Sequence, residues 1–566
     1  MDAADDVTTG QTAVDPITLE VIRHGVVSIT DQIDANITRT AFSPYIYEYR
    51  DFAVGLVGPE GESIAQCRGG MPIFVADSVG MAVRDGIATY GLDNLHPGDV
   101  ILCNHAAIQG QHLNNTVMYT PVFAGPEEDR LVGFFAINVH WIDVGGSVPR
   151  SRDIFEEGLQ LRSIKLWSKG APIEEVYRII GDNTRTPEAL MGDIEAQLAG
   201  CLLGRDLTRE LAERYGPDTY LAGLAAILDQ SESATRARIR DMPDGTYESE
   251  AFLDNDGEGN TPVPIRIRVI VDGDELTVDY SDMAEAVPGC INSGYYGGGR
   301  TTARVAFKYL LGAQEAANEG TFRPLKLILP EGKLLSAPPT APMGNYGHPF
   351  PTIIDAVIRA FEQVAPDRVT GGHYGTFAGF RFLGTDATGA PFDCHVCGYG
   401  GWGASARGDG GGPFRTMAHG DTKLIPMELQ EALYPVLIEE LALRPDSGGA
   451  GRMRGGLGMI NTYLVGAPCR LVVKFDRVDC PPWGVAGGKD AKAGWVTVEK
   501  AATGERVTLR KDKGYPLEIG DRVIVTVGGG GGWGAPGERD AGAIARDIRL
   551  GYVTPEAART DYGRTG

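Results

Sequence analysis

Two short polar segments near the N-terminus contain residue types that commonly bind divalent metals. The first holds His112 and, three residues later, Asn115, and the second holds His140 and, three residues later, Asp143. Imidazole nitrogens combine with carboxylate or amide oxygens in many divalent-metal sites. The two glycines that follow Asp143 let the backbone turn, so that the side chains could converge. Because the chain has only nine histidines in 566 residues, this matched spacing predicts a metal site.

Tight binding needs a further acid, because the Asn115 amide is a neutral and weaker ligand than a carboxylate. Asp51 is the best candidate, since it opens a predicted strand directly after an aromatic-rich loop. The metal hypothesis therefore rests on Asp51, His112, His140 and Asp143. The alternative is that these residues only form hydrogen-bonded loops.

A third polar segment contains His419 and Asp421. The two side chains could form an acid–base pair or a substrate clamp, or a hydrogen-bonded turn before a helix that begins near Pro426. The Gly-Asn-Tyr-Gly-His-Pro segment at 344–349 is a candidate of the same rank. The sequence contains no G-x-S-x-G and no G-x-x-x-x-G-K-[ST] motif, so it predicts neither a nucleophile elbow nor an ATP-binding P-loop.

Two other motifs have a structural interpretation that we prefer. The glycine run at 528–534 offers backbone amides that could bind an anion, but it lacks a helix cap or lysine, so we favour a tight, close-packed turn. Cys394 and Cys397 have the spacing of a redox or zinc pair. Because no second C-x-x-C accompanies them, we favour a packed pair of thiols on a strand.

Hydrophobic periodicity places both histidine segments on one small sheet. Residues 16–41 carry the broad apolar stripe of a helix, and residues 51–65 alternate around a Gly-Pro-Glu-Gly turn like a β-hairpin. Strands are predicted at 99–104, 117–123 and 131–139. The two histidine segments then lie in loops of the same sheet, where they could face each other.

The rest of the chain predicts an α+β, multi-lobed fold with mixed and antiparallel sheets, a helical layer and glycine-rich loops. Other predicted elements are a hairpin at 263–280, helices at 301–311, 351–364 and 428–443, and a polar tail at 546–566 that could dock on a partner. The expected segments are an N-terminal α/β lobe with the metal loops (1–150), a helical segment (151–240), a central α+β lobe (241–450) and a β-rich C-terminal lobe with the tail (451–566).

The composition narrows the function classes. A formal net charge of −23 repels nucleic acid and anionic membranes, whereas a local basic patch at 150–152 leaves room for an anionic substrate. No run of 18 apolar residues occurs, so no transmembrane helix is predicted. The acidic start lacks the features of a signal peptide, and eight scattered cysteines suit a reducing compartment. We therefore expect a cytoplasmic protein.

Ordered motifs along almost the whole chain carry a family resemblance. With these motifs and the two histidine segments, the chain resembles the hydantoinase B/oxoprolinase family. The motifs are DPITLEVI (15–22), RTAFSP (39–44), RDF (50–52), PGDV (97–100), IFEEGL (154–159), NEGTFRP (318–324), LRPDSGGAG (443–451) and GGGGGWG (528–534).

The resemblance implies a cytoplasmic subunit that works with a separate, hydantoinase A-like ATP-binding subunit. In that scheme the partner phosphorylates or activates a carbonyl or enolate oxygen, and the B-type subunit, often with a divalent metal, completes the reaction. ATP would then lie on the partner, which fits the lack of a P-loop here. Family members include hydantoinases, 5-oxoprolinases and lactamases, which open cyclic amides, and subunits of acetone and acetophenone carboxylases.

The chain departs from the family pattern at the first loop. Typical relatives carry Asn-Asp-Pro-Tyr and His-Leu-Pro-Asp there, whereas this chain has Asn-His-Ala-Ala at 104–107 and His-Leu-Asn-Asn at 112–115. One expected carboxylate is thus the amide of Asn115, and another is His105, which is a candidate replacement ligand. A set richer in imidazole favours zinc or manganese over magnesium.

Three functions follow from these expectations. The leading hypothesis is a B-type subunit of an ATP-dependent cyclic-amide hydrolase in a hetero-oligomer, in which Asp51, His112 and His140 hold the metal and Asp143 serves as ligand or general base. Asp143 could instead only orient a histidine. The second is a subunit of a ketone carboxylase, and the third is a non-catalytic scaffold subunit.

Overall fold

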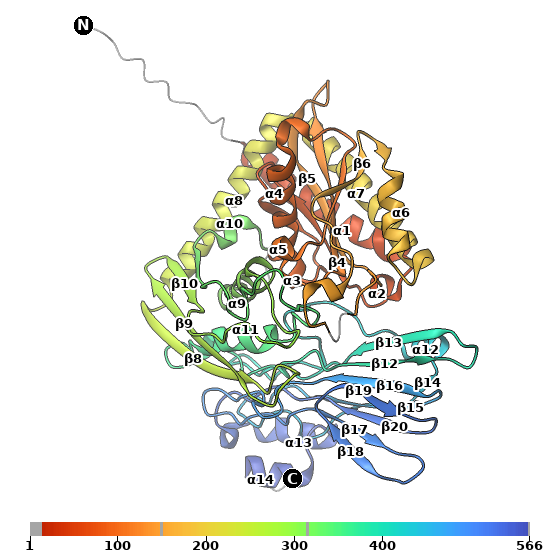
Figure 1. The fold of residues 1–566 in the computed structure, drawn as a ribbon. Coiled ribbons are helices and arrows are strands. Elements are labelled where there is room, and N and C mark those ends of the chain that lie inside the picture. The colour runs from red at the N-terminus through yellow and green to blue at the C-terminus, as the bar shows by residue number, and fades with distance from the viewer. Residues whose placement is uncertain (1–13, 148–150, 313–315, 564–566) are drawn as a thin grey trace.

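The computed structural model describes residues 14–147, 151–312 and 316–563. Figure 1 shows the N-terminal part of the chain at one end of the molecule, the last third at the other end, and the middle of the chain between them. Four sheets with helices between and around them confirm the predicted α+β class.

The N-terminal sheet contains the loops that the sequence marked as a metal site. It has seven strands, and each pairs with its neighbours in antiparallel fashion. In spatial order the strands are β2 (Ser63–Gln66), β1 (Phe52–Val57), β5 (Arg130–His140), β4 (Asn115–Ala124), β3 (Val100–Cys103), β6 (Ile164–Ser168) and β7 (Ala171–Pro172). The predicted hairpin and the three predicted strands are therefore confirmed.

Helices cover both faces of this sheet, so nearly every residue of β4 and β5 is buried. On β5, Phe134 packs towards one layer and Phe135 towards the other, as strand alternation requires. Gly204 of α7 permits the close approach, because a Cβ there would lie 2.2 Å from the Phe135 ring. The covering helices are α1 (Pro16–Thr40), α7 (Pro187–Tyr215) and α8 (Pro217–Arg240) on one face and α4 (Ser78–Tyr90) on the other.

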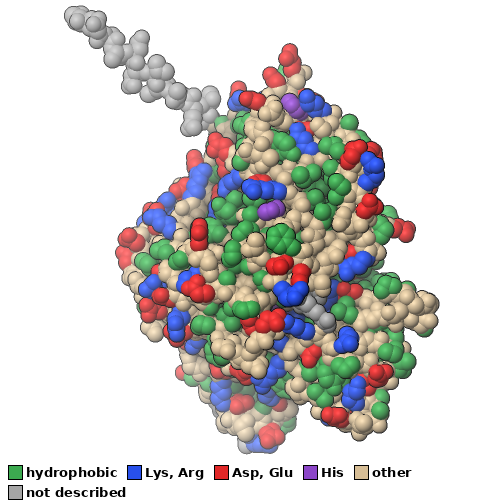
Figure 2. All heavy atoms as spheres, viewed as in Figure 1, with side chains coloured by type: hydrophobic (Ala, Val, Ile, Leu, Met, Phe, Trp, Pro, Cys, Tyr) green, Lys and Arg blue, Asp and Glu red, His purple; other side chains and the backbone are tan. Residues whose placement is uncertain are grey.

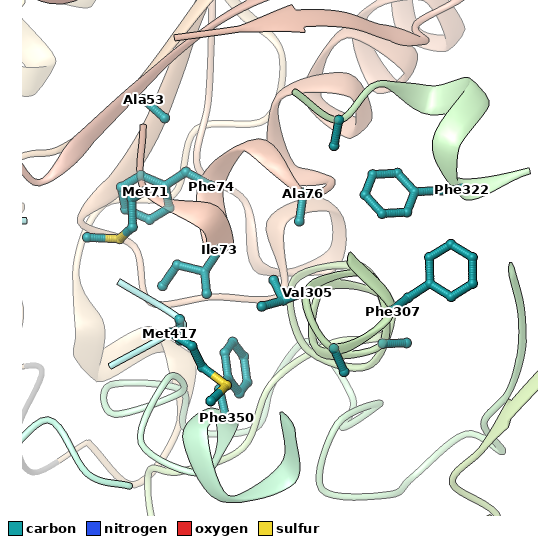
Figure 3. Close-up of a cluster of buried hydrophobic side chains, with 14 of the residues drawn as sticks. Ala53, Met71, Ile73, Phe74, Ala76, Val305, Phe307, Phe322, Phe350 and Met417 are labelled. Carbon is teal, nitrogen blue, oxygen red and sulfur yellow. The ribbon is translucent and has the colours of Figure 1, made fainter. Parts of the chain in front are cut away.

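The middle of the chain shares one hydrophobic core with the N-terminal part. In the close-up of Figure 3, Ile73 of α3 (Pro72–Val75) points towards Val305 of α9, while Met417 lies beside Phe350 of α11. The second sheet packs against α11. The elements here are β8 (Gly245–Leu253), β9 (Val263–Asp272), β10 (Glu275–Asp279), β11 (Leu325–Ile328), α9 (Thr301–Leu311) and α11 (Phe350–Arg359).

The last third of the chain forms two antiparallel sheets that pack face to face. Their facing side chains, such as Phe380, Val473 and Tyr463, form a second core. One sheet is β13 (Pro391–Cys397), β12 (Gly379–Thr385), β16 (Cys469–Lys474) and β19 (Lys511–Leu517); the other is β14 (Val436–Leu443), β15 (Met459–Val465), β20 (Arg522–Thr526), β17 (Trp495–Glu499) and β18 (Arg506–Leu509).

The predicted helix at 428–443 is wrong in its second half. The helix α12 (Met427–Leu433) ends before Tyr434, whose backbone is extended, and residues 436–443 form the strand β14. Pro435 has no N–H to continue the helix and disfavours a helical conformation at the residue before it. The β-branched residues Val436 and Ile438 then pair with β15.

The tail predicted at 546–566 is folded, as far as the structure describes it, and its docking on a partner stays a prediction. Residues 541–562 form α13 (Ala541–Arg549) and α14 (Pro555–Tyr562), which fold back on this chain. Ile544 and Tyr562 pack around Ala450, and the Asp547 carboxylate accepts a hydrogen bond of 3.1 Å from Arg454. The sequence analysis did not predict these helices, because the apolar residues of the segment are few and widely spaced.

The glycine run at 528–534 is a buried, close-packed segment, as we favoured from the sequence. Its peptide groups bond to other glycine-rich loops, with Gly530 donating to Gly456 at 3.0 Å and Gly531 donating to Gly372 at 2.8 Å. A Cβ at Gly530 would lie 2.0 Å from the carbonyl oxygen of Trp402. These stacked loops, which we call the glycine layer, are residues 398–412, 447–458, 484–489 and 528–534.

The charge of the chain is dispersed over the surface. Acidic and basic side chains are mixed on the face of the molecule seen in Figure 2. None of the helices in the described ranges is both long and apolar enough to span a lipid bilayer.

Candidate active site

A cavity of about 610 Å³ lies where the N-terminal sheet meets the sheet that contains β12, β13 and β16. Five of the nine histidines line it, together with several acidic, basic and aromatic side chains. The N-terminal wall includes Tyr45, Asp51, His112, Asn115, His140 and Glu157, and the opposite wall includes His348, Arg381, His395, His419 and Lys474.

The pairing of β1, β4 and β5 brings three predicted residues to one edge of the N-terminal sheet. Phe52 pairs with Val139, so the preceding Asp51 lies beside His140, and the His140 N–H donates to the Asp51 carbonyl at 3.0 Å. Asn115 lies directly opposite His140. His112, in the turn before β4, meets His140 edge to face with 5.0 Å between ring centroids. The expectation that the two histidine segments face each other is confirmed.

The Asp51 and His140 side chains carry buried atoms without a partner. Within the described residues, neither Oδ1 of Asp51 nor Nδ1 of His140 has a hydrogen-bond partner. Burial raises the pKa of the Asp51 carboxyl to about 7, although Arg415 opposes the shift. Burial, together with the neighbouring His112, lowers the pKa of His140 well below its ordinary range. The imidazole is therefore neutral at pH 7 and keeps a lone pair, as a metal ligand requires.

His112 faces oxygen at both ring nitrogens. Its Nε2 lies 3.0 Å from Oδ1 of Asn115, and its Nδ1 lies 3.3 Å from the Gly344 carbonyl oxygen. Burial lowers the pKa of His112 to about 4, against both hydrogen bonds, so the ring carries one N–H and leaves one lone pair facing an oxygen. Flipping the Asn115 amide would not remove this clash between a lone pair and an oxygen, because the amide nitrogen donates to Tyr346 and to Gln111, each at 2.9 Å. A cation between these groups would remove the conflict.

The donor chemistry of Asp51, His112 and His140 therefore fits a divalent metal. In the part of the chain that the structure describes, no three His, Cys, Asp or Glu side chains yet surround one point closely enough to hold an ion. The fit rests on the unpartnered atoms of Asp51 and His140 and on the conflict at His112.

Asp143 lines the same cavity but is committed to other partners. Arg185 forms an ion pair with it, Gly145 donates to Oδ1 at 3.1 Å and Thr184 donates to Oδ2 at 3.2 Å. Burial alone would raise the pKa of Asp143, but the hydrogen bonds from Arg185 outweigh it and hold the pKa below its usual value. The carboxylate thus fastens the loop at the cavity rim.

The structure separates the pair His419 and Asp421. His419 lines the cavity. Its Nδ1 lies 3.0 Å from the Thr416 hydroxyl, and 3.6 Å separate the centroids of its ring and the Phe377 ring. Asp421 is exposed and forms an ion pair of 3.0 Å with Lys423. His105, the candidate replacement ligand, accepts a hydrogen bond of 3.2 Å from the Ala107 N–H at the start of a short helix.

The sequence analysis marked the segments of His348 and His419 in the opposite wall, but it missed the residues that the strands of this wall contribute. His395 and Arg381 alternate along β13 and β12 with buried Val396 and Phe380, so one face of the sheet lines the cavity and the other joins the second core. Polar residues at every second position of an apolar strand were the available signal. Which cavity they face depends on pairing between distant segments, which the sequence does not show.

The same alternation corrects the interpretation of the two cysteines. Cys394 packs in the core between the two C-terminal sheets, whereas Cys397 packs on the other side with Tyr49 and Ile425. Both lie on β13, as predicted, but an odd spacing on a strand sends them to opposite faces. They therefore do not pack against each other as a pair.

Comparisons with known proteins agree with these motifs. The family model described as hydantoinase B/oxoprolinase matches residues 15–536. The chain is 32% identical to the beta subunit of the caprolactamase of Pseudomonas jessenii, over 97% of this chain and 96% of that protein. It is 28% identical to the B subunit of a putative D-/L-hydantoinase of a Pseudomonas species, over 98% and 95%.

Two solved structures share the fold. The ATP-dependent caprolactamase from Pseudomonas jessenii matches with a TM-score of 0.87 and 30% identity, over 97% of this chain and 96% of that one. A nucleotide-free acetone carboxylase chain matches with the same TM-score of 0.87 at 19% identity, over 98% of this chain and 80% of that one. At that identity the second match shows the fold alone. The chain belongs to the hydantoinase B/oxoprolinase family of enzymes.

Proposed function

We propose that this protein is the B-type subunit of an ATP-dependent cyclic-amide hydrolase and that the ring opens in the 610 Å³ cavity. The observation that carries the proposal is that Asp51, His112 and His140 line one cavity at the same sheet edge, in a setting that leaves an Asp51 oxygen and a His140 nitrogen without partners among the described residues. The names of the similar proteins, which are subunits of a caprolactamase and of a hydantoinase, support this reaction class.

Asp51, His112 and His140 would hold a divalent metal, with zinc or manganese favoured over magnesium because two ligands are imidazoles. When bound there, such an ion would polarise an amide carbonyl and favour deprotonation of a water molecule. The chain's own contribution is to present one carboxyl and two neutral imidazoles at a single sheet edge. Asp143 would hold the rim loop through Arg185, which suits a positioning role better than a ligand role.

The remaining lining suits a cyclic amide. Apolar side chains, among them Ile73, Phe74 and Phe377, supply surface for the ring carbons and exclude water around the reacting bond. Glu157 lies in the same wall, and burial raises the pKa of its carboxyl to about 7. A carboxyl with that pKa can exchange a proton near neutral pH, as the nitrogen that leaves an opened ring requires.

ATP would be bound by a hydantoinase A-like partner in a hetero-oligomer. The similar proteins are named as a beta subunit and a B subunit, which supports a partner, and the solved caprolactamase is ATP-dependent, which supports the use of ATP. All eight cysteines are free thiols in this structure, which supports work in a reducing cytoplasm.

Ketone carboxylation at the same site is the second candidate, since the acetone carboxylase chain shares the fold. An assay with the co-expressed partner separates the functions. The purified complex would be given ATP with a hydantoin, a lactam or 5-oxoproline, and separately with a ketone and bicarbonate. ATP-dependent ring opening supports the proposal, and bicarbonate-dependent formation of a keto acid would replace it with carboxylation.

Metal analysis of the same preparations tests the site itself. We expect near-stoichiometric zinc or manganese in the wild-type protein and its loss from His112→Ala and His140→Ala. The exposed His24 provides the control, because His24→Ala should keep the metal. A wild-type protein that is inactive on all these substrates and binds no metal would point to a scaffold subunit.

A further inference from the structure

The cavity contains a lysine that the metal proposal does not use. Lys474 ends β16 and lines the wall opposite Asp51. Its ammonium group donates to the side-chain oxygen of Asn345. Among the described residues, no carboxylate lies within ion-pair distance of it. The other cavity cations differ, because Arg381 pairs with Asp393 and Arg185 pairs with Asp143.

Burying a charged lysine without an acidic partner costs free energy. Burial, together with the nearby charge of Arg381, lowers the pKa of Lys474 to about 8. On the next strand, Lys511 lies opposite Lys474, but its ammonium bonds to the Asp476 carboxylate at 2.7 Å. Partly desolvated cations without a counter-charge are binding groups for anions, since the anion restores the missing charge.

The surroundings of Lys474 would complete an anion site. His348 and His395 line the same wall as neutral imidazoles, because burial lowers the pKa of each well below its ordinary range. A neutral imidazole still carries one N–H that can donate to an oxyanion. Arg381 adds a guanidinium that is already partly neutralised by Asp393. The ionisable groups around Lys474 are Arg381, Asp393, Cys290, Cys397, Lys511, His112, His348 and His395.

We propose that Lys474, assisted by His348 and His395, anchors an anionic oxygen group on the molecule that reacts at Asp51, His112 and His140. This rests on the proposed function, because it places the anion on the wall opposite the reacting carbonyl. The substrate class is then a cyclic amide that carries an anionic group. That group is either a carboxylate of the substrate itself or a phosphoryl group added by the partner.

Equilibrium binding to the full-length chain tests the anchor without requiring turnover. The probes are inorganic phosphate, 5-oxoproline as a carboxylate-bearing lactam, and 2-pyrrolidinone as the same lactam without the carboxylate. We would measure dissociation constants by calorimetry for the wild type, Lys474→Met and Lys474→Arg. The control is Lys326→Met, which removes an exposed lysine paired with Glu275 on β11.

We expect Lys474→Met to weaken binding of the anionic probe by about tenfold or more, the worth of a charge-assisted hydrogen bond. Lys474→Arg should keep most of the affinity, and 2-pyrrolidinone should bind equally to all variants. Loss confined to phosphate assigns the site to a phosphoryl group, and loss confined to 5-oxoproline assigns it to a substrate carboxylate.

Two outcomes would overturn the proposal: neither anion binds the wild type, or both bind Lys474→Met as tightly as the wild type. A wild-type melting temperature of Lys474→Met shows that its loss of binding does not come from misfolding. If the protein binds the anion but the complex opens no ring, the proposed function is wrong and the role of Lys474 in anion binding stands. If the complex opens the ring and Lys474→Met does so equally well, the proposed function stands and the role of Lys474 is wrong.

Discussion

The rings of His112 and His140 meet edge to face with 5.0 Å between their centroids. One ring belongs to the turn before β4 and the other ends β5, so the antiparallel pairing of these two strands holds both at one edge. Burial keeps both imidazoles neutral. Because Asp51 lies beside His140, this edge presents a carboxyl together with the two rings, and each of the three groups can be changed separately.

Asp51 and Asp143 should differ in their effect on metal content. Asp51→Asn removes a carboxyl with an unpartnered oxygen, so we expect metal affinity to fall by about 100-fold or more, beyond the usual effect of an outer-sphere change. Asp143→Asn removes a carboxylate that Arg185 already occupies, so the metal should stay. Elemental analysis after gel filtration measures both. Loss of metal from Asp143→Asn, with wild-type content in Asp51→Asn, would invert these roles.

Asn115→Asp should strengthen metal binding. The side-chain oxygen of Asn115 already lies 3.0 Å from Nε2 of His112, and a carboxylate there adds a charged ligand to the set. We expect the dissociation constant for zinc to fall by about tenfold, measured by competition with a chelator. The exposed Asn94→Asp is the matched control for added charge. An unchanged constant in Asn115→Asp would place the metal away from this side chain.

The metal-free protein should lose stability as the pH rises towards 7. The pKa of Asp51 is about 7 in the folded protein against an ordinary 3.8, and that of Glu157 is about 7 against 4.5. Each carboxyl therefore takes up a proton on folding, so its stabilising effect is complete at low pH and is lost between about pH 4 and pH 7.

Thermal unfolding at pH 5 and pH 8 tests whether the metal-free protein loses stability as the pH rises. Asp51→Asn should reduce the difference between the two pH values by roughly 2–4 kcal/mol, and Glu157→Gln should reduce it further. Zinc or manganese should raise the melting temperature more at pH 8, where Asp51 can lose its proton to the ion. A metal-free wild type that is more stable at pH 8 than at pH 5 would contradict the raised pKa values.

Two helical glycines should respond in opposite directions to alanine. In α7, a Cβ at Gly204 would lie 2.2 Å from the buried Phe135 ring, so Gly204→Ala should destabilise the fold by about 1–3 kcal/mol. In α6 (Glu174–Asp182), nothing lies within 4 Å of a Cβ at Gly181, so Gly181→Ala should stabilise it by about 0.5–1 kcal/mol. Denaturant unfolding measures both changes. If Gly204→Ala also stabilised the fold, the packing against Phe135 would have rearranged to accept the new methyl group.

Local patterns predicted the elements that carry the N-terminal wall of the cavity. The apolar stripe of residues 16–41 and the alternation at 51–65 are periodic signals within one segment, and α1, β1 and β2 confirmed them. The helix at 428–443 failed because one proline outweighed a helical pattern, and pairing with β15 then selected a strand. Tertiary pairing overrides local propensity in such places.

The other wall of the cavity could not be predicted in the same way. Lys474, Arg381 and His395 come from three strands whose order in the sheet is set by contacts between distant parts of the chain. Alternation shows that these residues share a face only after the strands are paired. The sequence therefore identified the candidate metal ligands and the loop segments of His348 and His419, and it missed the strand residues across from the ligands.

The glycine layer has a consequence for the heat capacity of unfolding. Its loops are held by bonds between peptide groups, such as Gly530 to Gly456, and peptide atoms fill the space that side chains fill elsewhere. Exposing polar surface lowers the heat capacity, whereas exposing apolar surface raises it. This part of the molecule should therefore add less to the heat-capacity change, residue for residue, than the Phe- and Ile-rich core around α9. A chain with 78 glycines then has a flatter dependence of stability on temperature than its length alone suggests.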